Sequence, residues 1–189
     1  AEYKTPYIET AVRNERYITE LSEVNTEASS SNFLVVARIA VYEAENGLYN
    51  ILKLENENIK NTENTPLHLL SINAEVQSST LLVQVEIHTA FDGEKVVTLT
   101  KPVTKGEFAF VSVEFKTGEN KVIIVSDLEA KPIEIITTGA IEKLQPSAQL
   151  SLFGIRTPED KNIIAELIHT YLVPNVNDQG SKITELFRT

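Results

Sequence analysis

Residues 81–91 read LLVQVEIHTAF, and the alternation within this stretch decides the fold. Apolar side chains recur at every second position, while the positions between them include the polar residues Gln84, Glu86 and His88. A period of two is typical of a β-strand with one buried face and one solvent-facing face. Asp92-Gly93 and a new apolar segment follow, so the strand is expected to turn back on itself as a hairpin.

The same pattern extends outward on both sides of this stretch. Between residues 33 and 155 we expect about nine strands separated by turn signals, at the spacing of an antiparallel β-sandwich or jelly-roll-like body. The predicted strands are Phe33–Glu45, Leu48–Leu54, Leu67–Val76, Thr80–Phe91, Lys95–Thr100, Glu107–Phe115, Lys121–Ser126, Pro132–Thr137 and Ala148–Ile155.

Two connections carry specific turn predictions. Asn46-Gly47 is the strongest short hairpin signal in the chain, because a type I′ turn needs two residues that tolerate positive φ. Residues 116–120 (KTGEN) predict a second, Gly-containing hairpin loop. Residues 55–66 are rich in Glu and Asn and are expected to form a polar surface loop.

The C-terminal segment shows a different pattern. Thr157-Pro158 has the features of a helix start, a capping hydroxyl followed by Pro. The apolar residues then fall at helical spacing, which predicts a helix over 158–172 that ends before Pro174. Residues 181–187 are expected to add one or two further helical turns. The apolar residues of the main stripe are Ile163, Ile164, Leu167, Ile168 and Tyr171.

Residues 1–31 are polar and end in a Ser-rich stretch, 25–31, that resembles a linker. Their apolar spacing matches neither a helix nor a strand, so we interpret them as an arm. The predicted organisation is therefore an N-terminal arm (1–31), a β-sandwich domain (32–156) and a C-terminal helix and tail (157–189).

Composition excludes several classes of protein. The chain contains no Cys, which removes disulfides, thiol nucleophiles and thiolate metal sites. Acidic residues outnumber basic ones 27 to 17, giving a net charge of −10. A nucleic-acid partner requires a basic surface, so none is expected. The apolar runs are too short to span a bilayer, so no membrane insertion is expected.

Few residues suggest chemistry. His68, His88 and His169 are far apart in sequence, and Glu166 with His169 supplies a single Glu-x-x-His pair where di-iron bundles use two. No nucleophile elbow, phosphate-binding loop or calcium loop is present. Glu residues on strand faces are interpreted as solvated, although a pair assembled by the fold stays possible. We therefore expect no catalytic residue, no metal, no cofactor and no enzymatic activity.

The arm offers the main candidate interface. It is too polar to form its own core, so contacts elsewhere must offset the cost of ordering it, roughly 1 kcal/mol or more per residue. Whether it packs on its own subunit or on a neighbour is left open. The candidate interface residues are Tyr3, Tyr7, Ile8, Val12, Tyr17, Ile18 and Leu21.

These observations favour a structural subunit of an assembly, most simply a virion protein of a tailed virus (capsid-associated or tail), with copies of itself or other structural subunits as partners. A secreted pilus or surface-fibre subunit, extracellular or on the cell surface, is the first alternative. A ligand- or carbohydrate-binding β-sandwich module is the second alternative.

Overall fold

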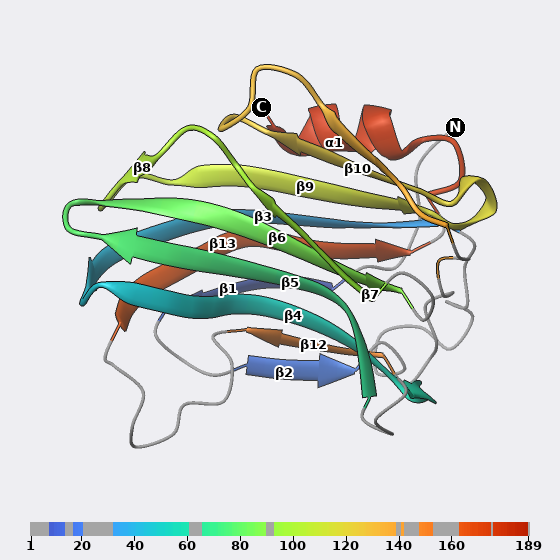
Figure 1. The fold of residues 1–189 in the computed structure, drawn as a ribbon, viewed down its shortest axis with the longest axis horizontal. Coiled ribbons are helices and arrows are strands. Elements are labelled where there is room, and N and C mark those ends of the chain that lie inside the picture. Colours follow the sequence, from blue (N-terminus) through green and yellow to red (C-terminus); the bar gives the residue numbers. More distant parts are fainter. Residues whose placement is uncertain are drawn as a thin grey trace.

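The computed structural model describes residues 8–13, 17–20, 32–60, 66–89, 93–138, 141, 148–152, 163–174 and 176–188. Two antiparallel sheets pack face to face, and one helix lies outside them (Figure 1). The expected mainly-β, sandwich-type fold is confirmed. Among the described residues, no helix is both long and apolar enough to cross a bilayer.

The first sheet, sheet A, has six strands. In spatial order they are β1 (Ile8–Arg13), β13 (Ile163–Pro174), β3 (Asn32–Ala44), β9 (Ala109–Lys116), β10 (Lys121–Ser126) and β11 (Ile133–Ile136).

The second sheet, sheet B, has seven strands. Its order is β2 (Tyr17–Glu20), β12 (Gln149–Leu152), β4 (Gly47–Lys60), β5 (Pro66–Gln77), β6 (Thr80–Thr89) and β7 (Gly93–Thr98), and the short β8 (Val103–Thr104) also pairs with β6. The strand predicted from residues 81–91 is thus β6, near one edge of sheet B, and its hairpin with β7 is confirmed.

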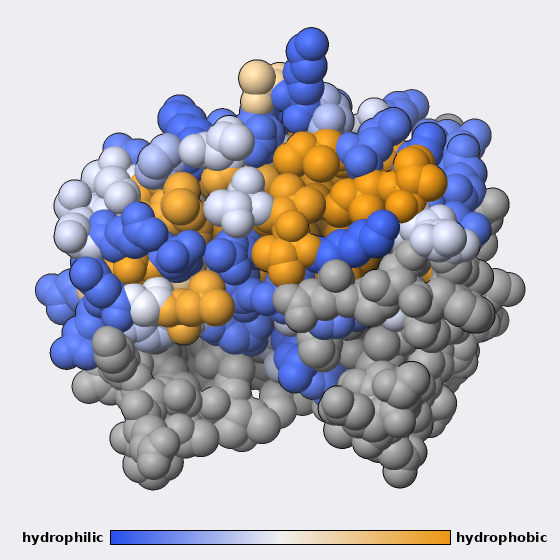
Figure 2. Space-filling model, in the orientation of Figure 1, coloured by the Kyte–Doolittle hydropathy of each residue, from blue (hydrophilic) through white to orange (hydrophobic). Residues whose placement is uncertain are grey.

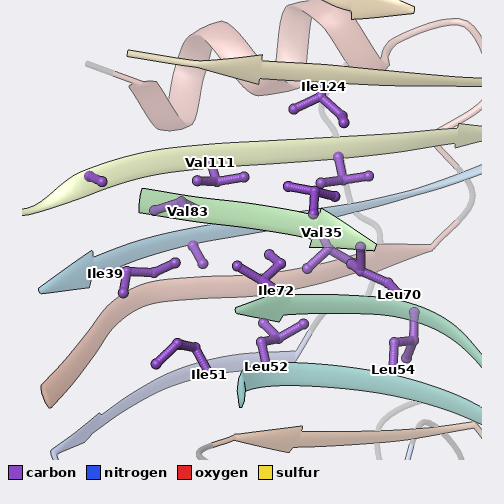
Figure 3. Close-up of a cluster of buried hydrophobic side chains, with 14 of the residues drawn as sticks. Val35, Ile39, Ile51, Leu52, Leu54, Leu70, Ile72, Val83, Val111 and Ile124 are labelled. Carbon is purple, nitrogen blue, oxygen red and sulfur yellow. The ribbon is translucent and has the colours of Figure 1, made fainter. Parts of the chain in front are cut away.

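The core fills the space between the sheets, and side chains from both sheets meet there (Figure 3). Along β6 the burial alternates strictly, so the apolar positions of the period-two sequence pattern are the residues that face the core. By contrast β3 and β9 are buried on both faces, because α1 (Gly180–Arg188) covers the outer face of sheet A. Core residues from the two sheets include Val35, Ile39, Val111, Ile124, Leu52, Leu70, Ile72 and Val83.

Helix α1 packs on β3 and β9. In Figure 1 it lies at the top of the view, and β2 and β12 lie at the bottom. A second, smaller apolar cluster joins it to sheet A, and Tyr171 stacks on Phe187 with ring centroids 4.3 Å apart. The short helical segment expected at 181–187 is therefore confirmed. The other members of this cluster are Leu34, Val36, Phe110, Val173, Val176 and Ile183.

The predicted helix over 158–172 is wrong in its described part, because Ile163–Pro174 is strand β13 between β1 and β3. Its register shifts between Ile164 and Ala165 and again between Ile168 and Tyr171. A bulge inserts an extra residue and moves the buried face along the strand. At the first shift the extra residue is Tyr42 of β3, whereas at the second shift it belongs to β13. This one bulge interrupts the period-two alternation of β13 and gives its apolar residues an apparent helical spacing.

Two loop predictions are also wrong. β4 continues to Lys60, so residues 55–60 are strand and not a surface loop. Asn46-Gly47 does not close a hairpin, because it connects β3 in sheet A to β4 in sheet B. The loop at 116–120 is confirmed: β9 and β10 pair through Lys116 and Lys121, around a 3₁₀ turn at Thr117–Glu119.

The described parts of the N-terminal segment lie at the edges of the two sheets. β1 pairs with β13, and β2 pairs with β12. In this chain these strands therefore hydrogen-bond to their own sandwich. The division into an arm (1–31), a body (32–156) and a C-terminal segment (157–189) stays a prediction.

Candidate functional site

The outer face of sheet B carries a hydrogen-bonded band of polar side chains. Cross-strand register places Asn50 of β4 opposite Asn73 of β5, and Asn73 opposite Gln84 of β6. The next row places Ser71 opposite Glu86. Residues directly opposite one another share a face of the sheet, and the residues between them point into the core. The outward side chains of three adjacent strands therefore converge on this band.

A bulge in β4 creates this alignment. The register between β4 and β5 shifts between Asn50 and Leu52, so Ile51 is the additional residue. Ile51 and Leu52 are both buried in the core. In a regular strand of this sequence Asn50 and Lys53, three positions apart, would lie on opposite faces, because side chains alternate with a period of two. The bulge places both on the outer face.

One chain of hydrogen bonds crosses three strands. Asn50 Nδ2 donates to Asn73 Oδ1 at 3.0 Å, and Asn73 Nδ2 donates to Glu86 Oε1 at 3.0 Å. Asn50 Nδ2 also donates to the backbone oxygen of Leu52 at 3.3 Å. Asn73 is only 6% exposed although it lies on the outer face. These contacts hold its amide in one orientation.

A second chain of hydrogen bonds runs beside the first. The carboxylate of Glu75 accepts from Gln77 Nε2 at 3.2 Å and from Gln84 Nε2 at 3.3 Å. Amide N–H groups in both chains therefore point at carboxylates. The outer face is rich in hydrogen-bond acceptors that neighbouring residues already orient.

His88 adds an imidazole to the same face. Its Nε2 lies 3.5 Å from Glu86 Oε2, and its side chain is only 14% exposed. The shared face of His88 and Glu86, predicted from the alternation, is confirmed, and the imidazole is largely buried on it. Lys53 of the same face lies 2.7 Å from Glu55 Oε1, so its charge is paired.

Apolar side chains border the polar band. Leu48 is 59% exposed and stands opposite Glu75, and Val96 is 46% exposed and stands opposite Glu86. Figure 2 shows hydrophobic residues reaching the surface in a band among hydrophilic side chains. A face that joins oriented polar groups to exposed apolar groups has the features of a ligand-binding surface.

The other candidate residues lie elsewhere. Glu166 lies on β13 and accepts a hydrogen bond from Tyr42 at 2.9 Å, on the outer face of sheet A. The carboxylate of Asp127 accepts a hydrogen bond from the backbone N–H of Phe110 at 3.1 Å. The side chains of His68 and His169 fall outside the described part of the structure. Nowhere in the described ranges do three or more His, Asp or Glu side chains gather closely enough to hold a metal ion.

The candidate interface residues of the N-terminal segment are placed only in part. The backbones of Ile8 and Val12 pair with Leu172 and Leu167 of β13. Those of Tyr17 and Ile18 pair with Leu152 and Ser151 of β12. Their role as an interface stays a prediction. Tyr3, Tyr7 and Leu21 lie outside the described residues.

No protein-family model matches the sequence, and no curated protein is detectably similar to it in sequence. Solved structures do share the fold. A SAP-like pentraxin from Limulus polyphemus, a native heptamer, matches with a TM-score of 0.56 and 11% identity, over 97% of this chain and 78% of that chain. The binding domain of botulinum neurotoxin serotype D matches with a TM-score of 0.59 and 11% identity, over 97% of this chain and 42% of that chain.

An alginate lyase from Pseudomonas aeruginosa also matches, with a TM-score of 0.53 and 12% identity, over 79% of this chain and 67% of that chain. At such identities these matches establish the sandwich fold alone. They correct one prediction: we expected no enzymatic activity, and that expectation is wrong, because alginate lyases are among the proteins built on this fold. The virion prediction receives no support from them.

Proposed function

We propose that this chain is a carbohydrate-binding β-sandwich module whose ligand lies across the outer face of sheet B. The observation that carries the proposal is the hydrogen-bonded chain Asn50–Asn73–Glu86, which holds polar groups of three strands in fixed positions. Pre-organised groups lose less conformational entropy on binding than free ones. A strand face that serves only solubility has no need of such order.

The chemistry of the face suits a saccharide. Hydroxyl groups of a sugar donate to carboxylate and amide oxygens, and its C–H faces pack on apolar side chains such as Leu48 and Val96. Proteins with the same fold act on or bind carbohydrates, which supports this class of ligand. They include alginate lyases, and a botulinum neurotoxin type C whose cell entry depends on two ganglioside molecules.

Binding to a panel of soluble polysaccharides, measured by affinity electrophoresis and calorimetry, tests the proposal. Gln84→Ala removes an amide that donates to Glu75 at 3.3 Å. Gln179→Ala is its matched control, because Gln179 donates to Asp178 at 3.0 Å in the loop before α1. We expect Gln84→Ala to weaken binding about tenfold and Gln179→Ala to leave it unchanged. Equal affinities in all three proteins would count against the proposed face.

One observation favours a second candidate function, cleavage of the bound saccharide. The His88 imidazole lies beside the Glu86 carboxylate, with Nε2 3.5 Å from Oε2, on the same face as the band. An imidazole oriented by a carboxylate is a common proton-transfer group in enzymes. New chain ends should then appear when the protein is incubated with the polysaccharide it binds. His88→Gln should abolish the formation of new chain ends while binding persists. If this variant still forms new chain ends, His88 takes no part in the cleavage.

A further inference from the structure

We propose that the ligand of this face is an uncharged saccharide, selected by the carboxylates of Glu75 and Glu86. The inference rests on the proposed function and adds the class of ligand to it. The two carboxylates would accept hydrogen bonds from sugar hydroxyls and would repel polymers that carry carboxylates of their own, such as alginate.

The hydrogen-bond pattern supplies the first argument. Gln77 and Gln84 donate to Glu75, and Asn73 donates to Glu86. Each carboxylate oxygen can accept about two hydrogen bonds, so these amides orient the carboxylates without exhausting them. The remaining lone pairs require donors, and the hydroxyl groups of an uncharged sugar are donors.

The balance of charge supplies the second argument. Among the outward side chains of β4, β5 and β6 that the structure describes, Lys53 is the single Lys or Arg, and Glu55 lies 2.7 Å from it. Glu75 and Glu86 therefore keep a negative field over the face. Like charges close together repel, and the repulsion grows as water is displaced from between them. An anionic polymer would meet this repulsion along its whole length.

Replacing a carboxylate by the isosteric amide distinguishes uncharged from anionic saccharides, because it should weaken the binding of the first and tighten the binding of the second. Glu75→Gln removes a charge-assisted acceptor, which weakens the hydrogen bonds to an uncharged ligand. The same substitution removes a repulsion from an anionic ligand, which tightens its binding. Glu185→Gln is the matched control, because it removes one charge from an exposed position on α1, behind sheet A.

The experiment is calorimetric titration of wild type, Glu75→Gln, Glu86→Gln and Glu185→Gln. The probes are neutral gluco-, manno- and galacto-oligosaccharides and, as the anionic probe, alginate oligosaccharides, each at low and high salt. We expect a neutral oligosaccharide to bind, with affinity about threefold to tenfold weaker in either band variant, unchanged in Glu185→Gln and insensitive to salt. Thermal melting of each variant establishes that it is folded.

Two results would overturn the inference in distinguishable ways. If the alginate oligosaccharides bind more tightly than the neutral ones and Glu75→Gln tightens them further, the ligand is anionic. The proposed carbohydrate-binding function then stands, and the assignment of ligand class fails. If wild type binds no saccharide of either class, the proposed function fails and the inference fails with it.

Discussion

The carboxylate of Glu114, on the outer face of β9, lies directly against the α-carbon of Gly180, the first residue of α1. A Cβ atom at position 180 would overlap the Glu114 side chain. Glu114 is only 4% exposed, so it has little room to move aside. The absence of a side chain at Gly180 is what lets α1 approach sheet A.

Gly180→Ala tests this contact. Overpacking of a well-packed site typically costs 1–3 kcal/mol, and the better helix propensity of Ala offsets part of that cost. We therefore expect a loss of stability of about 1–2 kcal/mol, measured by chemical denaturation. In a Glu114→Ala background the same substitution should cost almost nothing, because the overlapping group is gone. Equal costs in both backgrounds would show that the two residues are not coupled.

Burial also makes Glu114 a source of pH dependence. Desolvation raises the pKa of its carboxyl above 4.5, with Lys116 opposing and Glu119 adding to the increase. A raised pKa in the folded state means that folding is favoured while the group is protonated. Its contribution is fully present below the unfolded-state pKa and is lost as pH rises through the folded-state pKa.

The melting temperature of Glu114→Gln should therefore equal that of wild type at about pH 4 and exceed it at neutral pH. Melting curves of both proteins over this pH range provide the measurement, with the exposed Glu185→Gln as the control for net charge. The opposite trend, in which wild type gains on the variant as pH rises, would mean that the N-terminal dipole of α1 outweighs desolvation of the carboxylate.

Arg38 holds the other end of α1. Its Nη2 donates to the backbone oxygens of Phe187 at 3.0 Å and Arg188 at 2.9 Å, and its guanidinium lies 5.1 Å from the centre of the Phe110 ring. A Lys side chain cannot reproduce this planar contact. We expect Arg38→Lys to cost about 1–3 kcal/mol and to speed amide hydrogen exchange in the last turn of α1. Unchanged amide exchange in this turn would show that contacts other than those of Arg38 hold the end of α1.

The strand assignment of residues 163–174 makes a prediction that a helix would not. Leu167 is fully buried between the sheets, whereas Ile164 is half-buried on the other side of β13. Leu167→Ala should cost about 2–5 kcal/mol and Ile164→Ala clearly less. An amphipathic helix would place both residues in one apolar stripe, and similar costs would support that alternative. Denaturant titration of the two variants distinguishes them.

How much of this fold was predictable from the sequence differs between strands. β6 carries one buried face and no bulge, so its pattern could be read directly. β13 contains a bulge between Ile168 and Tyr171 that moves its buried face by one position, and the other shift adds a residue to β3. The shifts depend on β3 and β1, which are distant in sequence. Asn46-Gly47 likewise has the composition of a hairpin turn. Packing of the two sheets, and not this dipeptide, determines that the following strand β4 joins sheet B.

The candidate site was predictable only in part. The alternation around residue 85 places Gln84, Glu86 and His88 on one face, which the structure confirms. Their partners could not be predicted, because Asn50 reaches Asn73 only through the bulge at Ile51. The near burial of Asn73 on an outer face also depends on that register. The alternation within β5 was the one available signal for Ser71, Asn73 and Glu75.

The central claim, that the outer face of sheet B binds a saccharide, is tested most directly by an amide NMR titration of the full chain with the tightest-binding oligosaccharide. We predict that the shifts gather in β4, β5 and β6, at residues 48–55, 71–77 and 82–88, and that α1 and the outer face of sheet A are unaffected. Shifts confined to α1 and sheet A, or none at saturating oligosaccharide, would contradict the claim.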